Sequence, residues 1–122
     1  MLNGSTVLVV EEEFLIALDI QRMLENLDVG QVVFARSVDE AQGFREHWTG
    51  ARLAIVEVTL QRHQAFALIA TLQSLGICVV LSSADGSLRH GIEQFPTLPV
   101  VLKPMAEHDL VQAIGLAISP PA

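Results

Sequence analysis

The feature that most constrains the fold is a fivefold alternation of short apolar runs with helical patterns. Four of the runs are rich in β-branched residues, and QVVFA is a fifth that we expect near an edge of a sheet. The runs are TVLVV (6–10), QVVFA (31–35), LAIVEV (53–58), ICVVL (77–81) and LPVVL (98–102). Runs that are apolar on both faces are typical of strands in a parallel sheet covered by helices on both sides.

A helical pattern follows each of the five runs. The predicted helices cover residues 14–27, 38–48, 63–76, 85–95 and 106–118. The helix at 85–95 is the weakest, because Gly86 and Gly91 lower its propensity. Parallel strands need crossover connections, so five consecutive βα units predict a doubly wound α/β fold, (βα)5, with a five-stranded parallel sheet.

Length and charge narrow the class of protein. The chain has 122 residues, of which 51% are hydrophobic, and this fits one domain with a real core. We expect a single domain over 1–122, with 119–122 as a tail and no output domain. The net charge of −7 argues against direct binding of nucleic acid, which needs a basic face.

The sequence predicts a cytoplasmic protein. Its single cysteine, Cys78, cannot form an internal disulfide and lies in an apolar run, where we expect it buried and inert. The N-terminus has no basic region before its apolar run, so it is a poor signal peptide. No apolar stretch approaches the roughly 20 residues that span a bilayer, so no membrane association is expected.

Polar residues stand at the carboxyl ends of four predicted strands. They are Glu11 and Glu12 after the first strand, Glu57 in the third, Ser82 after the fourth and Lys103 after the fifth. In doubly wound folds ligands bind at this edge of the sheet, so we expect these side chains to meet there.

This set of side chains suits phosphoryl transfer. Clustered carboxylates are costly unless a cation or a proton relieves them, and Mg²⁺ prefers such oxygen ligands. A lysine and a hydroxyl opposite them would contact phosphate oxygens. Phosphoryl transfer relies mainly on this kind of positioning and charge neutralisation.

On these motifs the chain resembles the receiver domain of two-component response regulators over nearly its whole length. VLVVEEE stands where the family has an acidic pair, LAIVEVTL where it has the phosphorylated aspartate, VVLSSA where it has Ser or Thr, and VVLKP where it has Lys-Pro. The resemblance implies the flavodoxin-like receiver fold and a bacterial phosphorelay protein that is not an enzyme. It also implies Mg²⁺ at Glu11 and Glu12, phosphate contacts from Ser82 and Lys103, and a histidine kinase, phosphotransferase or other signalling protein as partner.

Two residues depart from the family pattern. Glu57 replaces the acceptor aspartate, and Glu12 stands where the family usually has aspartate. Each glutamate reaches about 1.3–1.5 Å further than aspartate, and in-line transfer is sensitive to misplacement on that scale. The sequence therefore predicts a pseudo-receiver that is not efficiently phosphorylated, has no active catalytic residue and binds Mg²⁺ weakly or not at all.

Three interpretations of the altered site remain open. In the first, Glu57 pairs with Lys103 and Ser82 turns inward, which fixes an active-like state. In the second, the pocket is a relic and Glu57–Lys103 is a structural ion pair, which often stabilises little. In the third, the site is still a phosphorylation-competent or Mg²⁺-binding switch.

Two surfaces are candidates for protein contacts. Phe14, Leu15 and Leu18 lie outside the core stripe of the first helix, where either neighbouring loops bury them or a partner binds them. In receivers this helix is where a kinase or phosphotransferase domain docks. The fourth helix, fifth strand and fifth helix, at 85–95, 98–102 and 106–118, form the second candidate, for a homodimer.

Two other functions compete with this resemblance. A flavodoxin-like small-molecule binding module would need a Gly/Ser/Thr-rich loop after the first strand to hold phosphate, but EEEF is there and repels it. A phosphate-ester hydrolase would need an aspartate nucleophile and a cap that excludes water, and the chain offers neither.

Overall fold

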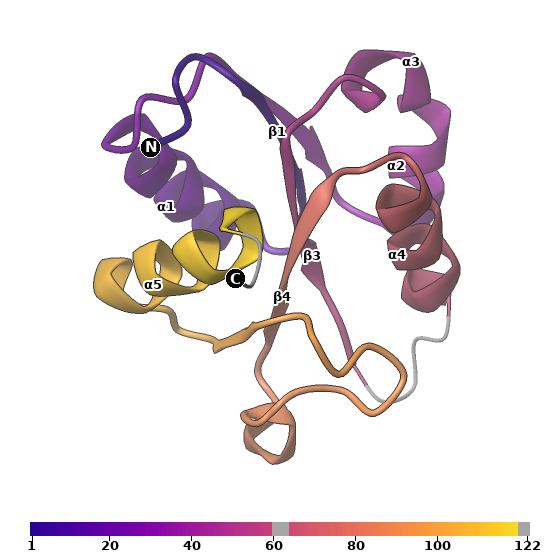
Figure 1. Cartoon of the computed structure of the whole chain (residues 1–122), viewed down its shortest axis with the longest axis vertical. Coiled ribbons are helices and arrows are strands. Elements are labelled where there is room, and N and C mark those ends of the chain that lie inside the picture. The colour runs from indigo at the N-terminus through magenta and orange to yellow at the C-terminus, as the bar shows by residue number, and fades with distance from the viewer. Residues whose placement is uncertain (60–63, 120–122) are drawn as a thin grey trace.

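The computed structural model describes residues 1–59 and 64–119, and its centre is one five-stranded sheet (Figure 1). All strand pairs are parallel, in the order β2-β1-β3-β4-β5. The strands are β1 (Thr6–Val10), β2 (Gln31–Ala35), β3 (Leu53–Glu57), β4 (Cys78–Ser83) and β5 (Val100–Leu102). The predicted doubly wound α/β class is confirmed.

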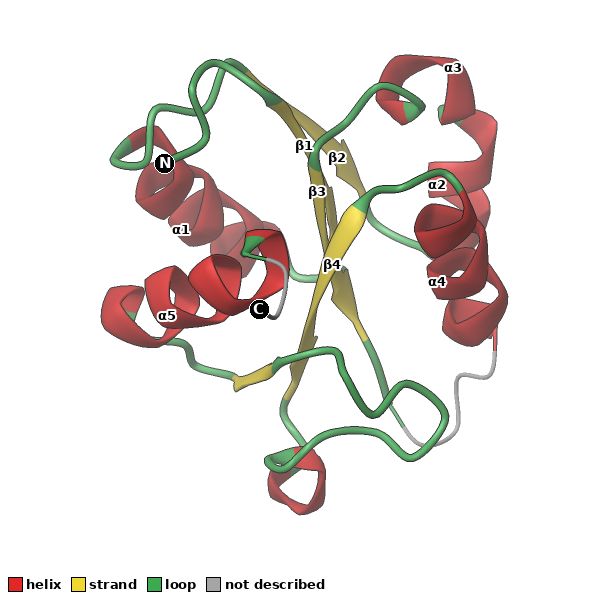
Figure 2. Ribbon diagram, viewed as in Figure 1, coloured by secondary structure: helices red, strands yellow, loops and turns green. Residues whose placement is uncertain are grey.

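Helices cover both faces of the sheet (Figure 2). Two of them, α1 (Phe14–Glu25) and α5 (Glu107–Ile118), lie on one face. The other face carries α2 (Val38–Gly43), α3 (Arg45–Trp48) and α4 (Gln64–Ser74). Side chains alternate between the two faces along each strand, so the sheet separates two hydrophobic cores.

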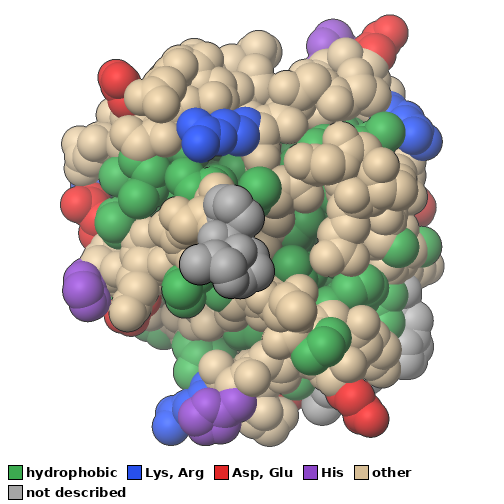
Figure 3. Space-filling model, viewed as in Figure 1, with side chains coloured by type: hydrophobic (Ala, Val, Ile, Leu, Met, Phe, Trp, Pro, Cys, Tyr) green, Lys and Arg blue, Asp and Glu red, His purple; other side chains and the backbone are tan. Residues whose placement is uncertain are grey.

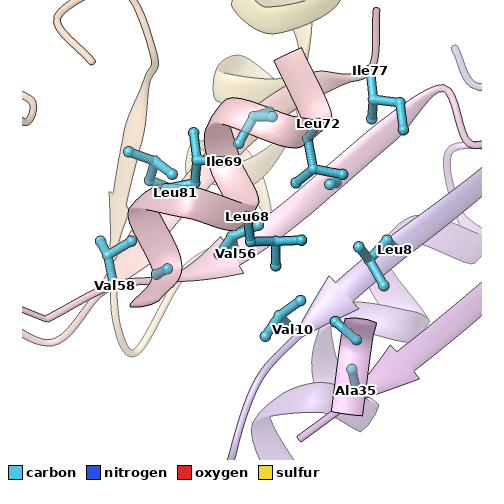
Figure 4. Packing of buried hydrophobic residues seen from close by; sticks show 14 of the residues in the cluster. Leu8, Val10, Ala35, Val56, Val58, Leu68, Ile69, Leu72, Ile77 and Leu81 are labelled. Carbon is cyan, nitrogen blue, oxygen red and sulfur yellow. The ribbon is translucent and has the colours of Figure 1, made fainter. Parts of the chain in front are cut away.

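The core beneath α2 and α4 shows this packing directly (Figure 4). Val56 of β3 and Leu81 of β4 pack against Leu68 of α4 in one buried cluster. Trp48 is fully buried there, and its indole N–H donates to the Ala41 carbonyl at 2.7 Å. Burial of such aromatic area fixes the short helices α2 and α3 to the sheet.

The structure corrects two predicted helices. The predicted helix at 38–48 is two helices, which are separated at Phe44. The predicted helix at 85–95 is wrong: only a 3-10 turn, η1 (Gly86–Leu88), forms there. Gly91 has φ = 114°, a backbone conformation that no α-helix contains, so the chain leaves helical geometry.

Smaller differences concern boundaries and Cys78. β5 begins at Val100 rather than at residue 98, and the predicted start of a helix at residue 63 lies outside the described residues. Cys78 is half-buried instead of fully buried. Within residues 1–59 and 64–119, no helix combines the length and apolar character needed to cross a membrane.

Candidate functional site

Four of the predicted site residues lie on the same face of the sheet, at its carboxyl edge. Each comes two residues after a core residue that packs beneath α1 and α5, and alternation therefore turns it to the same side. Those core residues are Val9, Ile55, Val80 and Val101. The site residues that follow them are Glu11, Glu57, Ser82 and Lys103.

The Lys103 ammonium group lies between two carboxylates. Its Nζ donates to Glu11 Oε1 at 3.1 Å, to Glu11 Oε2 at 3.2 Å and to Glu57 Oε2 at 2.5 Å. The side chains are 5% exposed for Lys103, 1% for Glu11 and 14% for Glu57. The three charges are thus largely withdrawn from water, and such a group stabilises only while every charge keeps its partner.

Backbone groups occupy further carboxylate lone pairs. The Glu13 N–H donates to Glu11 Oε2 at 2.9 Å, and the Glu12 N–H donates to Glu57 Oε1 at 3.3 Å. The side chain of Glu12 is exposed. The start of α1 therefore contributes backbone donors to the site, and every oxygen of Glu11 and Glu57 already accepts a hydrogen bond.

Ser82 and Lys103 complete the described site. Ser82 is the Cα partner of Glu57 across β3 and β4, yet its buried Oγ forms no hydrogen bond with any described residue. The Lys103 N–H donates to the Ser83 carbonyl at 2.8 Å, which anchors the end of β5 to β4. The Lys103–Pro104 peptide bond is cis.

Burial and charge shift two of the pKa values. Burial raises the pKa of Glu11 above its ordinary value, and the charge of Glu57 adds to this, against the opposing contacts with Glu13 and Lys103. Burial by itself lowers the pKa of Lys103, but hydrogen bonds to Glu57 and Glu11, together with their charges, outweigh it and raise that pKa. Lys103 is therefore firmly cationic.

The arrangement does not fit a magnesium ion. Mg²⁺ needs carboxylate oxygens that face a common point with room for water, but here the ammonium group of Lys103 lies between the carboxylates of Glu11 and Glu57. Over the described part of the chain, no three Asp, Glu, His or Cys side chains are grouped so that they could hold a metal. Lys103 supplies the positive charge that a metal would otherwise bring.

The three apolar residues of α1 are exposed beside this site. Phe14 is 69% exposed and Leu15 is 78% exposed, and Leu18 is also exposed. Neighbouring described loops therefore do not bury them. A shallow hollow of about 310 Å³ lies along the same helix, between Leu15 and Arg22.

Sequence reasoning missed part of the ion cluster. It paired Lys103 with Glu57, whereas the structure also pairs Lys103 with Glu11. β1 and β5 are separated by two strands, so only the long lysine side chain can join their ends. The consecutive acids after β1 could have indicated the Glu11–Lys103 pair, because a buried carboxylate needs a positive partner.

Solved structures of response regulators share this fold. No protein-family model matches the sequence, and curated proteins give no match. The chain is similar to SdrG from Sphingomonas melonis Fr1, with 27% identity, a TM-score of 0.78, and coverage of 98% of this chain and 100% of SdrG. It also matches a response regulator from Thermotoga maritima, with 23% identity, a TM-score of 0.75, and coverage of 96% of this chain and 99% of that one.

A third similar structure is longer than this chain. It is the response regulator PhyR from Brucella abortus, with 26% identity and a TM-score of 0.72. The match covers 94% of this chain but only 48% of PhyR. The similarity is therefore to one part of PhyR, about half of its length.

Proposed function

Since the chain belongs to the receiver domains of response regulators, we propose that it acts in two-component signalling through protein contacts, without efficient phosphorylation at Glu57. The observation that carries the proposal is the buried contact of Lys103 with both Glu57 and Glu11. It is a signalling protein rather than an enzyme, and it works in the bacterial cytoplasm.

The hydrogen bonds of Glu57 support this loss of acceptor function. A nucleophilic carboxylate oxygen must be free to approach phosphorus, but one oxygen of Glu57 accepts from Lys103 and the other from the Glu12 N–H. Among the described residues, the carboxylates of Glu11 and Glu57 hold Lys103 instead of the Mg²⁺ ion that would neutralise the incoming charge. Glu57 is thus committed to holding Lys103.

The position of Ser82 favours a structural ion pair over a mimic of the phosphorylated state. A carboxylate that stood in for phosphate would bond the Ser82 hydroxyl, because phosphate oxygens are strong acceptors. Ser82 Oγ is buried but makes no such bond, although Glu57 is its cross-strand partner. One carboxylate also carries one charge, against roughly two for phosphate.

Intact mass spectrometry tests the proposal. After incubation with Mg²⁺ and a small phosphodonor, the mass of the wild-type chain should stay unchanged. A receiver that has the acceptor aspartate, treated identically, should gain one phosphoryl group. A phosphoryl gain in the wild type that disappears in Glu57→Ala would contradict the proposal.

The exposed α1 surface, defined by Phe14, Leu15 and Leu18, is the proposed binding site for a histidine kinase or phosphotransferase domain. Such apolar exposure beside a receiver site is costly in water unless a partner covers it. No direct contact with nucleic acid or membrane is part of this proposal.

Substitution of this surface should separate binding from stability. Phe14→Ser/Leu15→Ser should change the free energy of unfolding by less than about 0.5 kcal/mol, because both side chains are exposed. It should weaken binding to the partner domain at least tenfold in a calorimetric titration. Leu75→Ser, on an exposed leucine of another helix end, is the matched control and should leave binding intact. A large loss of stability in the double variant would instead place these residues in the core.

A homodimer through β5 and α5 stays a prediction. The helix expected at 85–95 is absent, so a dimer at this face would use β5 and α5 without a helix on their other side.

A further inference from the structure

A groove runs along β5, beside the segment 85–95 in which the described chain forms no α-helix. Its volume is about 360 Å³. We call it the β5 groove, and its main lining residues are Arg89, His90, Val100, Leu102, Asp109 and Leu116. A second hollow of about 630 Å³ continues it past Leu98 and shares Arg89, His90 and Leu116. Figure 3 shows exposed apolar side chains on this side of the molecule.

Only every second residue of β5 directs its backbone N–H and C=O groups toward β4. The Pro99 carbonyl accepts from the Leu81 N–H at 2.9 Å, and the Lys103 N–H donates to the Ser83 carbonyl at 2.8 Å. In a parallel ladder alternate residues face the neighbouring strand, so the N–H and C=O groups of Val100 and Leu102 point outward. Within the described ranges, β5 pairs with β4 alone.

The side chains around this edge suit an apolar segment that carries an acid. Leu116 is 68% exposed, and Val100 and Leu102 are partly exposed, which provides an apolar floor. Arg89 and His90 are exposed on one bank, and neither forms an ion pair with another described residue. The two basic residues line both hollows, whereas the one acid of the lining, Asp109, lines only the 360 Å³ hollow.

We propose that the β5 groove binds an extended segment of a partner protein, which adds as a sixth strand beside β5. The outward N–H and C=O groups supply main-chain hydrogen bonds, and the apolar floor receives alternate side chains. A carboxylate of the segment pairs with Arg89 and His90. The β5 strand of a second copy fits less well as the added strand, because residues 99–104 read PVVLKP and contain no acid.

Amide NMR shifts test the proposal with a defined probe. The probe is an acetylated and amidated peptide, Glu-Val-Ser-Val-Ser-Leu-Ser, and the charge control replaces its glutamate with lysine. The acidic peptide should shift the amide signals of Val100 and Leu102 and bind about threefold or more tightly than the control. Absence of these shifts, equal binding of both peptides, or a concentration-dependent dimer mass of the chain alone would overturn it.

Two variants of the chain sharpen the test. Val100→Pro removes one outward N–H but keeps the hydrogen bonds of Pro99 and Lys103 to β4. It should therefore weaken binding of the acidic peptide about fivefold or more. Arg89→Glu leaves the β5 backbone unchanged and should weaken binding of the acidic peptide about threefold or more. It therefore tests the proposal even if Val100→Pro perturbs folding. Arg45→Glu, on α3, is the matched charge control and should bind as the wild type does. Unchanged affinity in Arg89→Glu would also overturn the proposal.

Discussion

A Glu12→Asp/Glu57→Asp variant should gain one phosphoryl group from a small phosphodonor with Mg²⁺, under conditions in which the wild type gains none. Each substitution withdraws a carboxylate by about 1.3–1.5 Å. An aspartate in place of Glu57 is too short to keep the contact with Lys103, while Glu11, Ser82 and Lys103 remain in place. A misplacement of about 1 Å can cost on the order of 100-fold in rate, so the gain in labelling should be of that size or larger.

The single variants show which residue blocks the reaction. Glu57→Asp alone should be labelled more slowly than the double variant, because Glu12 still reaches about 1.3–1.5 Å further than the aspartate of the double variant. Glu12→Asp/Glu57→Ala should not be labelled at all. If the folded double variant stays unlabelled, the block lies beyond these two carboxylates, and the assignment of Glu57 as the decisive change is wrong.

Lys103→Met should cause the largest loss of stability of any substitution at the site, about 3–5 kcal/mol in the free energy of unfolding. Methionine keeps most of the side-chain volume but removes the ammonium group that contacts both Glu11 and Glu57. Urea denaturation measures the effect. Mg²⁺ should restore part of the lost stability in Lys103→Met, because the carboxylates then face each other without a positive charge, but should not stabilise the wild type.

A second substitution provides the control. Lys103→Met/Glu57→Gln removes one of the uncompensated charges and should recover part of the loss, since neighbouring residues in one network are not additive. A loss below about 1 kcal/mol in Lys103→Met would mean that the cluster behaves as a surface ion pair. Equal stabilisation of wild type and variant by Mg²⁺ would show that Lys103 does not replace the metal.

The strands could be predicted from the sequence because each is a short run that is apolar on both faces. The same reasoning failed at 85–95, where Leu88 and Ile92 have helical spacing. There Asp85 caps only one turn, through its contact with the Ser87 N–H, and Gly91 turns the backbone away. Local backbone conformation, rather than hydrophobic pattern, decided that segment.

The site was predictable only in outline. Strand ends and their order bring Glu11, Glu57, Ser82 and Lys103 to one edge, and this follows from topology. Topology does not predict which of these side chains hydrogen-bond to each other, because that depends on the length of the Lys103 side chain and on the path of the chain into α1. The backbone N–H groups of Glu12 and Glu13 donate because of the geometry of that turn, and no residue type in the sequence predicts these hydrogen bonds.

The position of Lys103 bears on how a cell could regulate this protein. Its counterions are built into the chain, so under the proposed function neither phosphate nor magnesium sets its state. The remaining variable is copy number: each newly made chain presents the α1 surface at once and keeps it until the chain is degraded. Synthesis and proteolysis would then set the strength of the output, and the response would be as slow as protein turnover.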